Sequence, residues 1–257
     1  MIHPSAIIHS SAKIGKNVKV GPYSIIGENV EIGDGTKISS HVVINGPTIM
    51  GKDNRIFQFS SIGEDPQDKK YSEEKDSELH IGNRNTIREF CTISRGTHGG
   101  GGFTRVGDDN WIMAYVHIAH DCIVGNNNVF ANNTTLAGHV TVDDYVTLGG
   151  FTGVHQFTRV GTLSFSAIAS VIVKDVPPYI LVSGNTAKQS GLNTEGLKRN
   201  DIQKEQVEYI RKAYKIIYRE GLLLIQAIEK LEKLAIDSVE VELFMSFIKS
   251  SKRGITR

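Results

Sequence analysis

The sequence predicts a parallel β-helix followed by a small α-helical domain. Apolar residues recur every six positions, glycine often follows them, and the last part of the chain changes to a helical pattern. Stepping by six from Ile8 to Ile62 meets ten apolar residues in ten trials. At roughly 40% apolar content, chance would produce this about once in ten thousand. We therefore treat the six-residue period as a structural repeat.

The period of six fits a short strand and a turn, whereas an amphipathic helix repeats its apolar residues every 3.6 positions. Glycines after the apolar residues, as at Gly27 and Gly33, are expected to supply turn dihedrals. Three units close a triangular coil of about 18 residues, and coils stack as parallel strands about 4.8 Å apart. The register resumes at 81–93 and again at 106–160, so roughly eight coils are expected.

Two stretches interrupt the register, near residues 64–80 and 98–103. A solenoid can extrude loops from a corner without breaking its core, and such loops often carry function. After Val160 the repeat fades, and from about Asn200 apolar residues follow helical spacing with Glu/Lys pairs. The predicted domains are a β-helix over residues 1–190 and an α-helical domain over residues 191–257.

Composition excludes several classes of protein. The net charge of +1 gives the whole molecule no nucleic-acid or membrane-surface bias. No apolar run of about 18 residues exists, and the first residues lack the pattern of a secretory signal, so a cytoplasmic protein is expected. The two cysteines, Cys91 and Cys122, cannot form a disulfide scaffold. Both fall at the small inward position of the repeat and are expected to fill the core.

Stacking by about 18 positions gathers chemically active residues on one patch. His120, Gly138 and Gln156 form a predicted column, each about 4.8 Å from the last. The neighbouring positions hold His117, Asp121, His139 and His155. Four of the nine histidines therefore lie within this short part of the chain.

The chemistry suggested by this patch is acyl transfer by a general base. His120, with a reference pKa near 6.5, can take a proton from an attacking hydroxyl at neutral pH. Asp121 could fix the tautomer of this histidine, although adjacent residues on a strand point apart. The backbone N–H of Gly138 could hold the oxyanion. No Gly-x-Ser-x-Gly motif exists and Cys122 is expected to point inward, which favours direct attack by the acceptor over an acyl-enzyme.

Other interpretations of these features remain open. His117 and His120, with His139 or His155, could hold zinc between subunits, as in the hexapeptide carbonic anhydrases, although no metal is expected. The glycines at 99–102 resemble a phosphate loop but lack the following Lys-Ser/Thr, which favours a flexible loop tip. Residues 198–219 hold seven basic side chains against three acidic ones. This surface is a solvated helix face, or it meets an acidic partner or a nucleotide phosphate.

The sequence resembles the UDP-N-acetylglucosamine O-acyltransferases that begin lipid A synthesis, over essentially the whole chain. The segments that carry the resemblance are His117–Cys122, Leu136–Val140, Val154–Phe157, Asp175–Tyr179 and Asn193–Arg199. The resemblance implies a left-handed β-helix and a homotrimer with active sites between neighbouring prisms. It also implies transfer of an (R)-3-hydroxyacyl chain from acyl carrier protein to the glucosamine 3-hydroxyl of UDP-N-acetylglucosamine. No cofactor is implied beyond the phosphopantetheine of the carrier protein.

The same resemblance implies roles for individual residues. His120 matches the general base, Asp121 its supporting acid and Gly138 the oxyanion donor. Asp68 and Lys70 match sugar-contacting residues in the first extruded loop. The other positions that match the lining of the nucleotide-sugar and pantetheine sites are His117, His139, His155, Gln156, Asn193, Glu195 and Arg199. The basic C-terminal face would meet the acidic carrier protein.

Three positions depart from the family pattern. Ser94 stands where the family often has histidine, and Asn200 where arginine is common, which affects the expected sugar, phosphate or nucleotide contacts. Ile168 stands where long-chain members carry glycine, so we expect it to act as an acyl-chain ruler. A preference for about ten to twelve carbons is expected, because each lost CH₂ contact is worth about 0.8 kcal/mol. Other functions left open are a coenzyme A-dependent hexapeptide acetyltransferase and a non-catalytic solenoid that binds nucleotide sugar.

Overall fold

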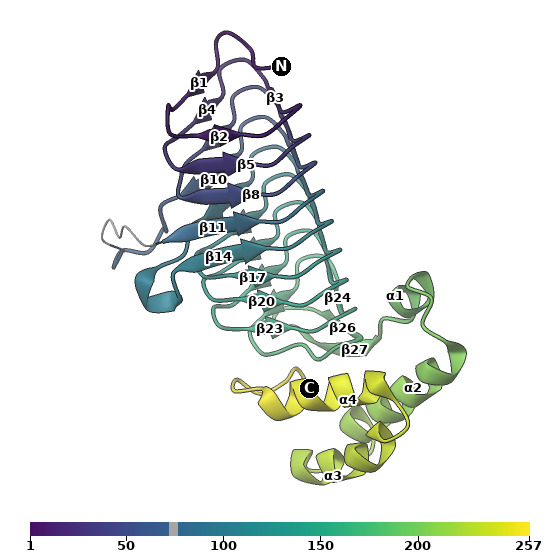
Figure 1. Ribbon diagram of the computed structural model, residues 1–257. Coiled ribbons are helices and arrows are strands. Elements are labelled where there is room, and N and C mark those ends of the chain that lie inside the picture. The colour runs from purple at the N-terminus through teal and green to yellow at the C-terminus, as the bar shows by residue number, and fades with distance from the viewer. Residues whose placement is uncertain (72–76) are drawn as a thin grey trace.

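The computed structural model describes residues 1–71 and 77–257, and most of these form a three-sided solenoid (Figure 1). The first sheet contains nine parallel strands, which are β1 (Ile7–Ile8), β4 (Ile25–Ile26), β7 (Val43–Ile44), β10 (Ser61–Glu64), β13 (Thr92–Ser94), β16 (His117–Ile118), β19 (Thr135–Leu136), β22 (Gly153–Val154) and β25 (Val171–Ile172).

The second and third sheets close the other two sides. The second sheet contains β2 (Lys13–Ile14), β5 (Val30–Ile32), β8 (Thr48–Met50), β11 (Glu78–Ile81), β14 (Phe103–Val106), β17 (Ile123–Val124), β20 (Thr141–Val142) and β23 (Arg159–Val160). The third contains β3 (Lys19–Val20), β6 (Lys37–Ile38), β9 (Arg55–Ile56), β12 (Thr86–Ile87), β15 (Trp111–Ile112), β18 (Val129–Phe130), β21 (Thr147–Leu148), β24 (Phe165–Ser166), β26 (Ile180–Ser183) and β27 (Lys188–Leu192).

The strand register confirms the predicted coil. Ile8 pairs with Ile26, one coil of 18 positions further on. Across the first extruded loop the offset grows to 31, as Ile62 pairs with Ile93, and across the second it is 25, as Ile93 pairs with Ile118. The two loops therefore add 13 and 7 residues to otherwise regular coils. Both leave the solenoid between a strand of the first sheet and a strand of the second.

The apolar residues of the repeat form the core, as predicted. The largest fully buried side chains are Phe130, Ile26, Ile44, Ile56, Ile62, Leu79, Ile87, Ile93, Ile112, Ile118, Leu136 and Leu148. All but Leu79 stand at the six-residue anchor positions. A core made of stacked aliphatic rows needs no contact between distant parts of the prism, so each coil is stabilised by its neighbours.

The predicted role of the glycines after these anchors was wrong except at Gly63, which has φ of 75°. The left-handed backbone positions at the corners are held by other residues, such as Asn17, Tyr23 and Asn127, with φ between 57° and 59°. Gly33 is instead required by the close approach of the next coil, because a Cβ there would lie 2.6 Å from the carbonyl carbon of Gly51. Small size, not turn conformation, selects glycine at this position.

Four helices follow the solenoid: α1 (Thr194–Arg199), α2 (Lys204–Tyr218), α3 (Leu224–Ala235) and α4 (Val239–Ser250). The long helices bury an apolar face that includes Ile210, Ile217 and Leu231. In Figure 1 they lie beyond the C-terminal end of the prism. The guanidinium of Arg159 lies 4.4 Å from the ring centroid of Phe247 on α4, which joins the two parts. Among the described residues, no helix is both long and apolar enough to cross a membrane.

Candidate active site

Most of the predicted site residues gather along one edge of the prism. We call it the site edge: the corner at which the chain passes from the first sheet to the second, between β10 and β11, β13 and β14, β16 and β17, β19 and β20, and β22 and β23. Both extruded loops leave the solenoid at this edge. His120 and Asp121 follow β16, and the corresponding turn after β19 holds Gly138 and His139.

His120 and Asp121 form a hydrogen-bonded pair. Nδ1 of His120 lies 2.7 Å from Oδ2 of Asp121. The expectation that adjacent residues point apart was wrong here, because both residues lie in the corner turn and Asp121 has φ of 59°. A carboxylate only accepts hydrogen bonds, so Nδ1 carries the proton and Nε2 keeps a free lone pair. That tautomer is the one a general base requires.

The carboxylate of Asp121 is fully buried and is held by the second extruded loop. Thr97 donates twice, from its backbone N–H to Oδ1 and from its Oγ1 hydroxyl to Oδ2, both at 2.8 Å. The backbone N–H of Asp121 donates to Oγ1 of Thr104 at 2.8 Å. A Cβ at Gly100 would lie 2.1 Å from Cγ of Asp121. One of the four glycines, which the sequence suggested to be a flexible loop tip, therefore packs directly against this carboxylate.

Gly138 lies next to the imidazole of His120, as the predicted column requires. A Cβ at Gly138 would lie 2.6 Å from Cε1 and 2.7 Å from Nε2 of His120. The absence of a side chain therefore makes the room in which the imidazole sits. The residue is buried, and within residues 1–71 and 77–257 its N–H donates no hydrogen bond. That group is free to donate to a ligand beside Nε2.

His139 and His117 flank the pair and are neutral at pH 7. Nε2 of His139 lies 3.6 Å from Oδ2 of Asp121, and its ring stacks on Phe157 with centroids 4.4 Å apart. Burial lowers the pKa of His139, against the opposing effect of Asp121. Burial, and then the charge of His120, lower the pKa of His117, whose Nδ1 lies 2.7 Å from Oγ1 of Thr92. Both rings are therefore hydrogen-bonding groups and not cations.

The first extruded loop approaches the same cluster. Asp68 is close enough for its charge to raise the pKa of His139. Its Oδ1 accepts the backbone N–H of Lys70 at 2.9 Å, so the two predicted sugar contacts share one turn. Arg95, from the second loop, donates to the carbonyls of Gly46 and Gly63 at 2.8 and 2.9 Å and pairs with Asp65. Residues 72–76 of the first loop lie outside the described residues.

His155 and Gln156 occupy the next turn of the site edge. Nδ1 of His155 lies 3.0 Å from the carbonyl oxygen of Gln156 and 3.2 Å from Nη2 of Arg253. Arg253 belongs to the tail after α4, which is fixed to the solenoid through Asp175. The N–H of Asp175 donates to the carbonyl of Gly254 at 3.0 Å. The tail thus places a cation beside the predicted nucleotide-sugar positions.

The predicted residues near α1 lie in a different part of the molecule. Asn193 caps α1, accepting from the N–H of Gly196 at 3.0 Å and donating to the carbonyl of Leu163 at 2.8 Å. Its amide is therefore engaged within the chain. Glu195 lines a cavity of about 670 Å³ with residues of α2, and Arg199 is exposed at the end of α1. Within the described parts of the chain, no hydrogen bond joins these three residues to His120.

The three departures from the family pattern have plain structural settings. Ser94 is buried at the end of β13. The side-chain amide of Asn200 donates to the carbonyl of Gly196 at 2.9 Å, which caps the C-terminus of α1. Ile168 is 71% exposed and lies between β24 and β25, at the opposite edge of the first sheet from His120. An acyl chain reaching from His120 to Ile168 within one chain would have to cross this sheet.

A cysteine nucleophile and a metal site are both disfavoured. Burial raises the pKa of the Cys91 and Cys122 thiols to about 12, so neither is a thiolate nucleophile. His120, Asp121 and His139 offer three ligand atoms within 4.8 Å of one another. However, Oδ2 of Asp121 already accepts from Thr97 and His120 at 2.7–2.8 Å. The donor set is thus satisfied by hydrogen bonds, which would have to break before a metal could bind.

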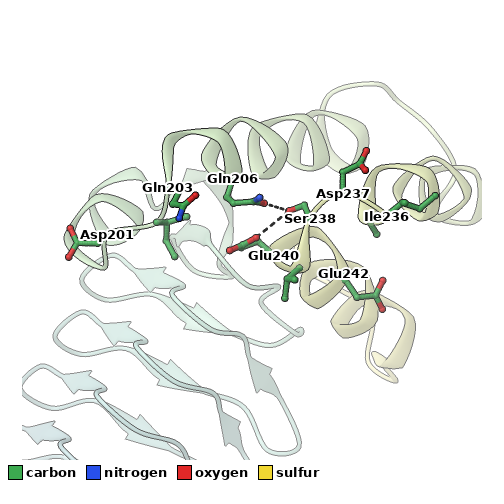
Figure 2. A pocket seen from close by; sticks show the side chains of 11 residues that line it. Asp201, Gln203, Gln206, Ile236, Asp237, Ser238, Glu240 and Glu242 are labelled. Atoms are coloured by element: carbon green, nitrogen blue, oxygen red, sulfur yellow. Dashed lines mark hydrogen bonds between the residues drawn. The ribbon is translucent and has the colours of Figure 1, made fainter.

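A large cavity in the helical domain offers no alternative site. It has a volume of about 650 Å³ and lies between α2 and the α3–α4 turn (Figure 2). Its lining includes Asp201, Asp237, Glu240 and Glu242, and Ser238 bonds there to Gln206 with 2.5 Å between the oxygens. So many carboxylates would repel a phosphate-bearing ligand. No histidine lines it.

The sequence did not reveal Thr97, Gly100, Arg95 or Arg253 as parts of the site. A signal for the first three existed: counting strands in threes places both extruded loops at the corner that later carries His120. Arg253 gave no such signal, because its position depends on how the helical domain packs against the solenoid.

Comparisons with known proteins agree with this architecture. A family model described as bacterial transferase hexapeptide (six repeats) matches residues 11–46 and 103–138. A second, described as UDP N-acetylglucosamine O-acyltransferase, domain 2, matches residues 175–256. Between them they cover part of the solenoid and nearly all of the helical domain.

Full-length relatives are similar over the whole chain. Acyl-[acyl-carrier-protein]–UDP-N-acetylglucosamine O-acyltransferases from Halorhodospira halophila and Neisseria gonorrhoeae are 51% and 52% identical. Each match covers 100% of this chain and 99% of the relative.

Solved structures show the same fold. The UDP-N-acetylglucosamine acyltransferase of Francisella novicida matches with a TM-score of 0.98 and 45% identity, covering 100% of this chain and 94% of the other. The enzyme of Moraxella catarrhalis matches with a TM-score of 0.97 and 47% identity, covering 100% and 99%. The expected left-handed parallel β-helix with C-terminal helices is thereby confirmed. This chain is an acyltransferase and belongs to the UDP-N-acetylglucosamine O-acyltransferase family.

Proposed function

We propose that this protein transfers an (R)-3-hydroxyacyl chain from acyl carrier protein to the 3-hydroxyl of UDP-N-acetylglucosamine, the first step of lipid A synthesis. The observation that carries the proposal is the His120–Asp121 pair, whose Nδ1···Oδ2 contact of 2.7 Å leaves Nε2 free beside Gly138. The full-length relatives, which are acyl-[acyl-carrier-protein]–UDP-N-acetylglucosamine O-acyltransferases, suggest the donor and the acceptor.

In the proposed reaction, Nε2 of His120 removes the proton from the glucosamine 3-hydroxyl. The hydroxyl oxygen attacks the thioester carbonyl, and the N–H of Gly138 donates to the oxyanion that forms. Collapse of the tetrahedral intermediate breaks the C–S bond. The imidazolium then returns its proton to the departing phosphopantetheine sulfur, giving ester and free thiol. Asp121 stabilises the imidazolium between these two proton transfers.

The substrate contacts in this proposal follow the site edge. Asp68 and Lys70 hold the sugar, while the neutral rings of His117 and His139 donate or accept hydrogen bonds. His155, Gln156, Asn193, Glu195 and Arg199 line the nucleotide and pantetheine sites. Because Asn193, Glu195 and Arg199 lie away from His120 in one chain, their participation fits an active site shared between subunits of a homotrimer.

The donor protein is proposed to dock on the basic helical surface. Lys212 and Lys215 on α2 line a groove of about 450 Å³ with Lys230 and Lys233 on α3 and with Glu220, which pairs with Lys230. Such a surface suits an acidic carrier protein better than it suits coenzyme A alone. The proposal needs no metal or cofactor in the protein, and it retains the cytoplasmic location expected from the sequence.

Ile168 is proposed to limit the acyl chain to about ten to twelve carbons, each excluded CH₂ contact being worth about 0.8 kcal/mol. Ile168→Gly should shift the preference toward longer chains. Competition between (R)-3-hydroxyacyl carrier proteins of different lengths measures this, and an unchanged preference would contradict the ruler.

The direct test mixes the protein with UDP-N-acetylglucosamine and acyl carrier proteins bearing chains of different length, followed by mass spectrometry of the nucleotide sugar. One acylation is expected with the carrier protein and none with acyl coenzyme A. Acylation from coenzyme A only would indicate the acetyltransferase alternative. Nucleotide binding without any acylation would indicate a non-catalytic solenoid. A parallel reaction with the 3-amino analogue tests the identity of the acceptor.

A further inference from the structure

We propose that Thr97 is a positioning residue for the acid–base pair, and that Gly100 allows it to reach Asp121. The segment Arg95–Gly102 acts as a clasp that fixes the carboxylate beside His120. The expected effect on kcat rests on the proposed function, whereas the fixed position of the Asp121 carboxylate does not.

Asp121 depends on this clasp for most of its partners. Its side chain is completely shielded from solvent, so water cannot replace a missing donor. Within the described residues, the donors within 3.5 Å of its carboxylate are the N–H and Oγ1 of Thr97 and Nδ1 of His120. Thr97 thus supplies two of the three hydrogen bonds. Without the Thr97 hydroxyl, Oδ2 would keep His120 as its only donor, and the carboxylate would be held less firmly in line with the imidazole.

The clasp is itself a closed structure. The N–H groups of Gly100 and Gly102 donate to the carbonyl of Thr97 at 3.0 and 2.9 Å, and the carbonyl of Gly102 accepts from Glu78 at 2.8 Å. These bonds fold the segment back on itself and join it to β11. Gly100 then lies so close to Asp121 that a Cβ would be 2.1–2.3 Å from three atoms of the carboxyl group. At Gly99, a Cβ would meet nothing within 4 Å.

The kinetic test compares Thr97→Val, which keeps shape and loses the hydroxyl, with Thr97→Ser, which retains the hydroxyl. Thr97→Val should lower kcat by about 5- to 100-fold, the rate equivalent of one unpaired buried group, with KM within about twofold. Thr97→Ser should recover most of kcat. Thr36→Val controls for loss of a buried threonine hydroxyl far from the site, where Oγ1 donates to Gly51. Gly100→Ala should lower kcat while Gly99→Ala does not.

A double-mutant cycle separates positioning from general destabilisation. If Thr97 acts through the carboxylate, Thr97→Val should cost little kcat in an Asp121→Ala background. An equal loss in both backgrounds, or a loss no larger than that in Thr36→Val, would overturn the proposal.

A substrate-free measurement keeps this inference distinct from the proposed function. The Nδ1 proton of His120 should give a downfield ¹H resonance that is absent in His120→Ala and moves upfield in Thr97→Val. If wild-type protein transfers no acyl group and the resonance still moves upfield in Thr97→Val, the proposed function fails and the clasp stands. An unchanged resonance in Thr97→Val would overturn the clasp whatever the activity.

Discussion

At the scale of single residues, the proposed site depends on the carboxylate of Asp121 and on the absence of a side chain at Gly138. His120 can act as a base because Asp121 fixes its tautomer and because Gly138 leaves room for the ring. Asp121 and Gly138 affect the base without any side-chain contact to the substrate. We therefore expect the proposed activity to be sensitive to changes that leave the imidazole itself intact.

Gly138→Ala should inactivate the enzyme without unfolding it. The new Cβ would lie 2.6 Å from Cε1 of His120, so the imidazole must move, and a displacement of this kind costs about 10²-fold in kcat. Steady-state kinetics with thermal unfolding as the folding check measures this. Gly153→Ala is the matched control, because a Cβ there meets nothing within 4 Å. Full activity in Gly138→Ala would show that the ring does not occupy this space.

The two neutral histidines predict a pH dependence of stability. Burial lowers the pKa values of His117 and His139 in the folded protein below the ordinary value of 6.5. The unfolded chain therefore takes up protons first, and the free energy of unfolding should fall as the pH drops below about 6.5. Above that pH these two histidines do not make the free energy of unfolding depend on pH.

Urea unfolding at pH 7.5 and 5.5 measures this effect. The decrease in the free energy of unfolding should be smaller in His117→Gln than in wild type, since one of the two groups is removed. An identical decrease in the two proteins would show that His117 is not held neutral in the fold.

At the scale of elements, polar ladders accompany the apolar rows. Buried Asn54, Asn85, Asn110 and Asn128 lie on successive coils. Nδ2 of Asn85 donates to Oδ1 of Asn54 at 3.1 Å, and Nδ2 of Asn110 donates to Oδ1 of Asn85 at 3.0 Å. Oδ1 of Asn110 accepts the N–H of Asn128 at 2.9 Å. The ladder satisfies backbone groups at a corner that water does not reach.

Asn110→Ala should destabilise the protein by about 2 to 5 kcal/mol, because it leaves a cavity and removes the side-chain partners of the Gly125 carbonyl and the Asn128 N–H. Urea unfolding measures this. Asn132→Ala, at an exposed corner, should stay within about 0.5 kcal/mol of wild type. Equal effects in the two variants would mean that the ladder adds no stability.

The regular elements were predictable because one period governs them. The anchors from Ile8 to Val160 determine strand spacing, core and stacking without reference to distant residues. The same count placed His120 beside Gly138, and the structure agrees. The extruded loops were located but their conformations were not predictable, since Thr97 and Gly100 are positioned by contacts with Asp121 that no period encodes. The position of Arg253 beside His155 likewise requires the packing of the helical domain.

At the scale of the whole molecule, one chain presents the site edge as an open surface. Asp121 is covered by its own clasp, but 22% of the His139 side chain is exposed. Residues such as Glu195 and Ile168, which the proposed function also requires, lie elsewhere on the same chain. An assembly that places the edge of one prism against another prism would bring these groups together.

If the proposed homotrimer forms, sedimentation equilibrium should give three times the chain mass of 28.2 kDa. Dilution below the dissociation range should lower the specific activity, because each proposed site is shared between two chains. A fully active monomer would contradict a shared site, although it would leave the His120–Asp121 pair intact.

Whether His120 is the general base is tested by the rate of acyl transfer to UDP-N-acetylglucosamine in His120→Ala compared with wild type. Mass spectrometry of the acylated nucleotide sugar gives the rate, and circular dichroism shows whether the variant is folded. Loss of the base should lower kcat by about 10² to 10⁴-fold in a folded protein. A folded His120→Ala variant that retains more than about a tenth of wild-type kcat would contradict the assignment of His120 as the general base.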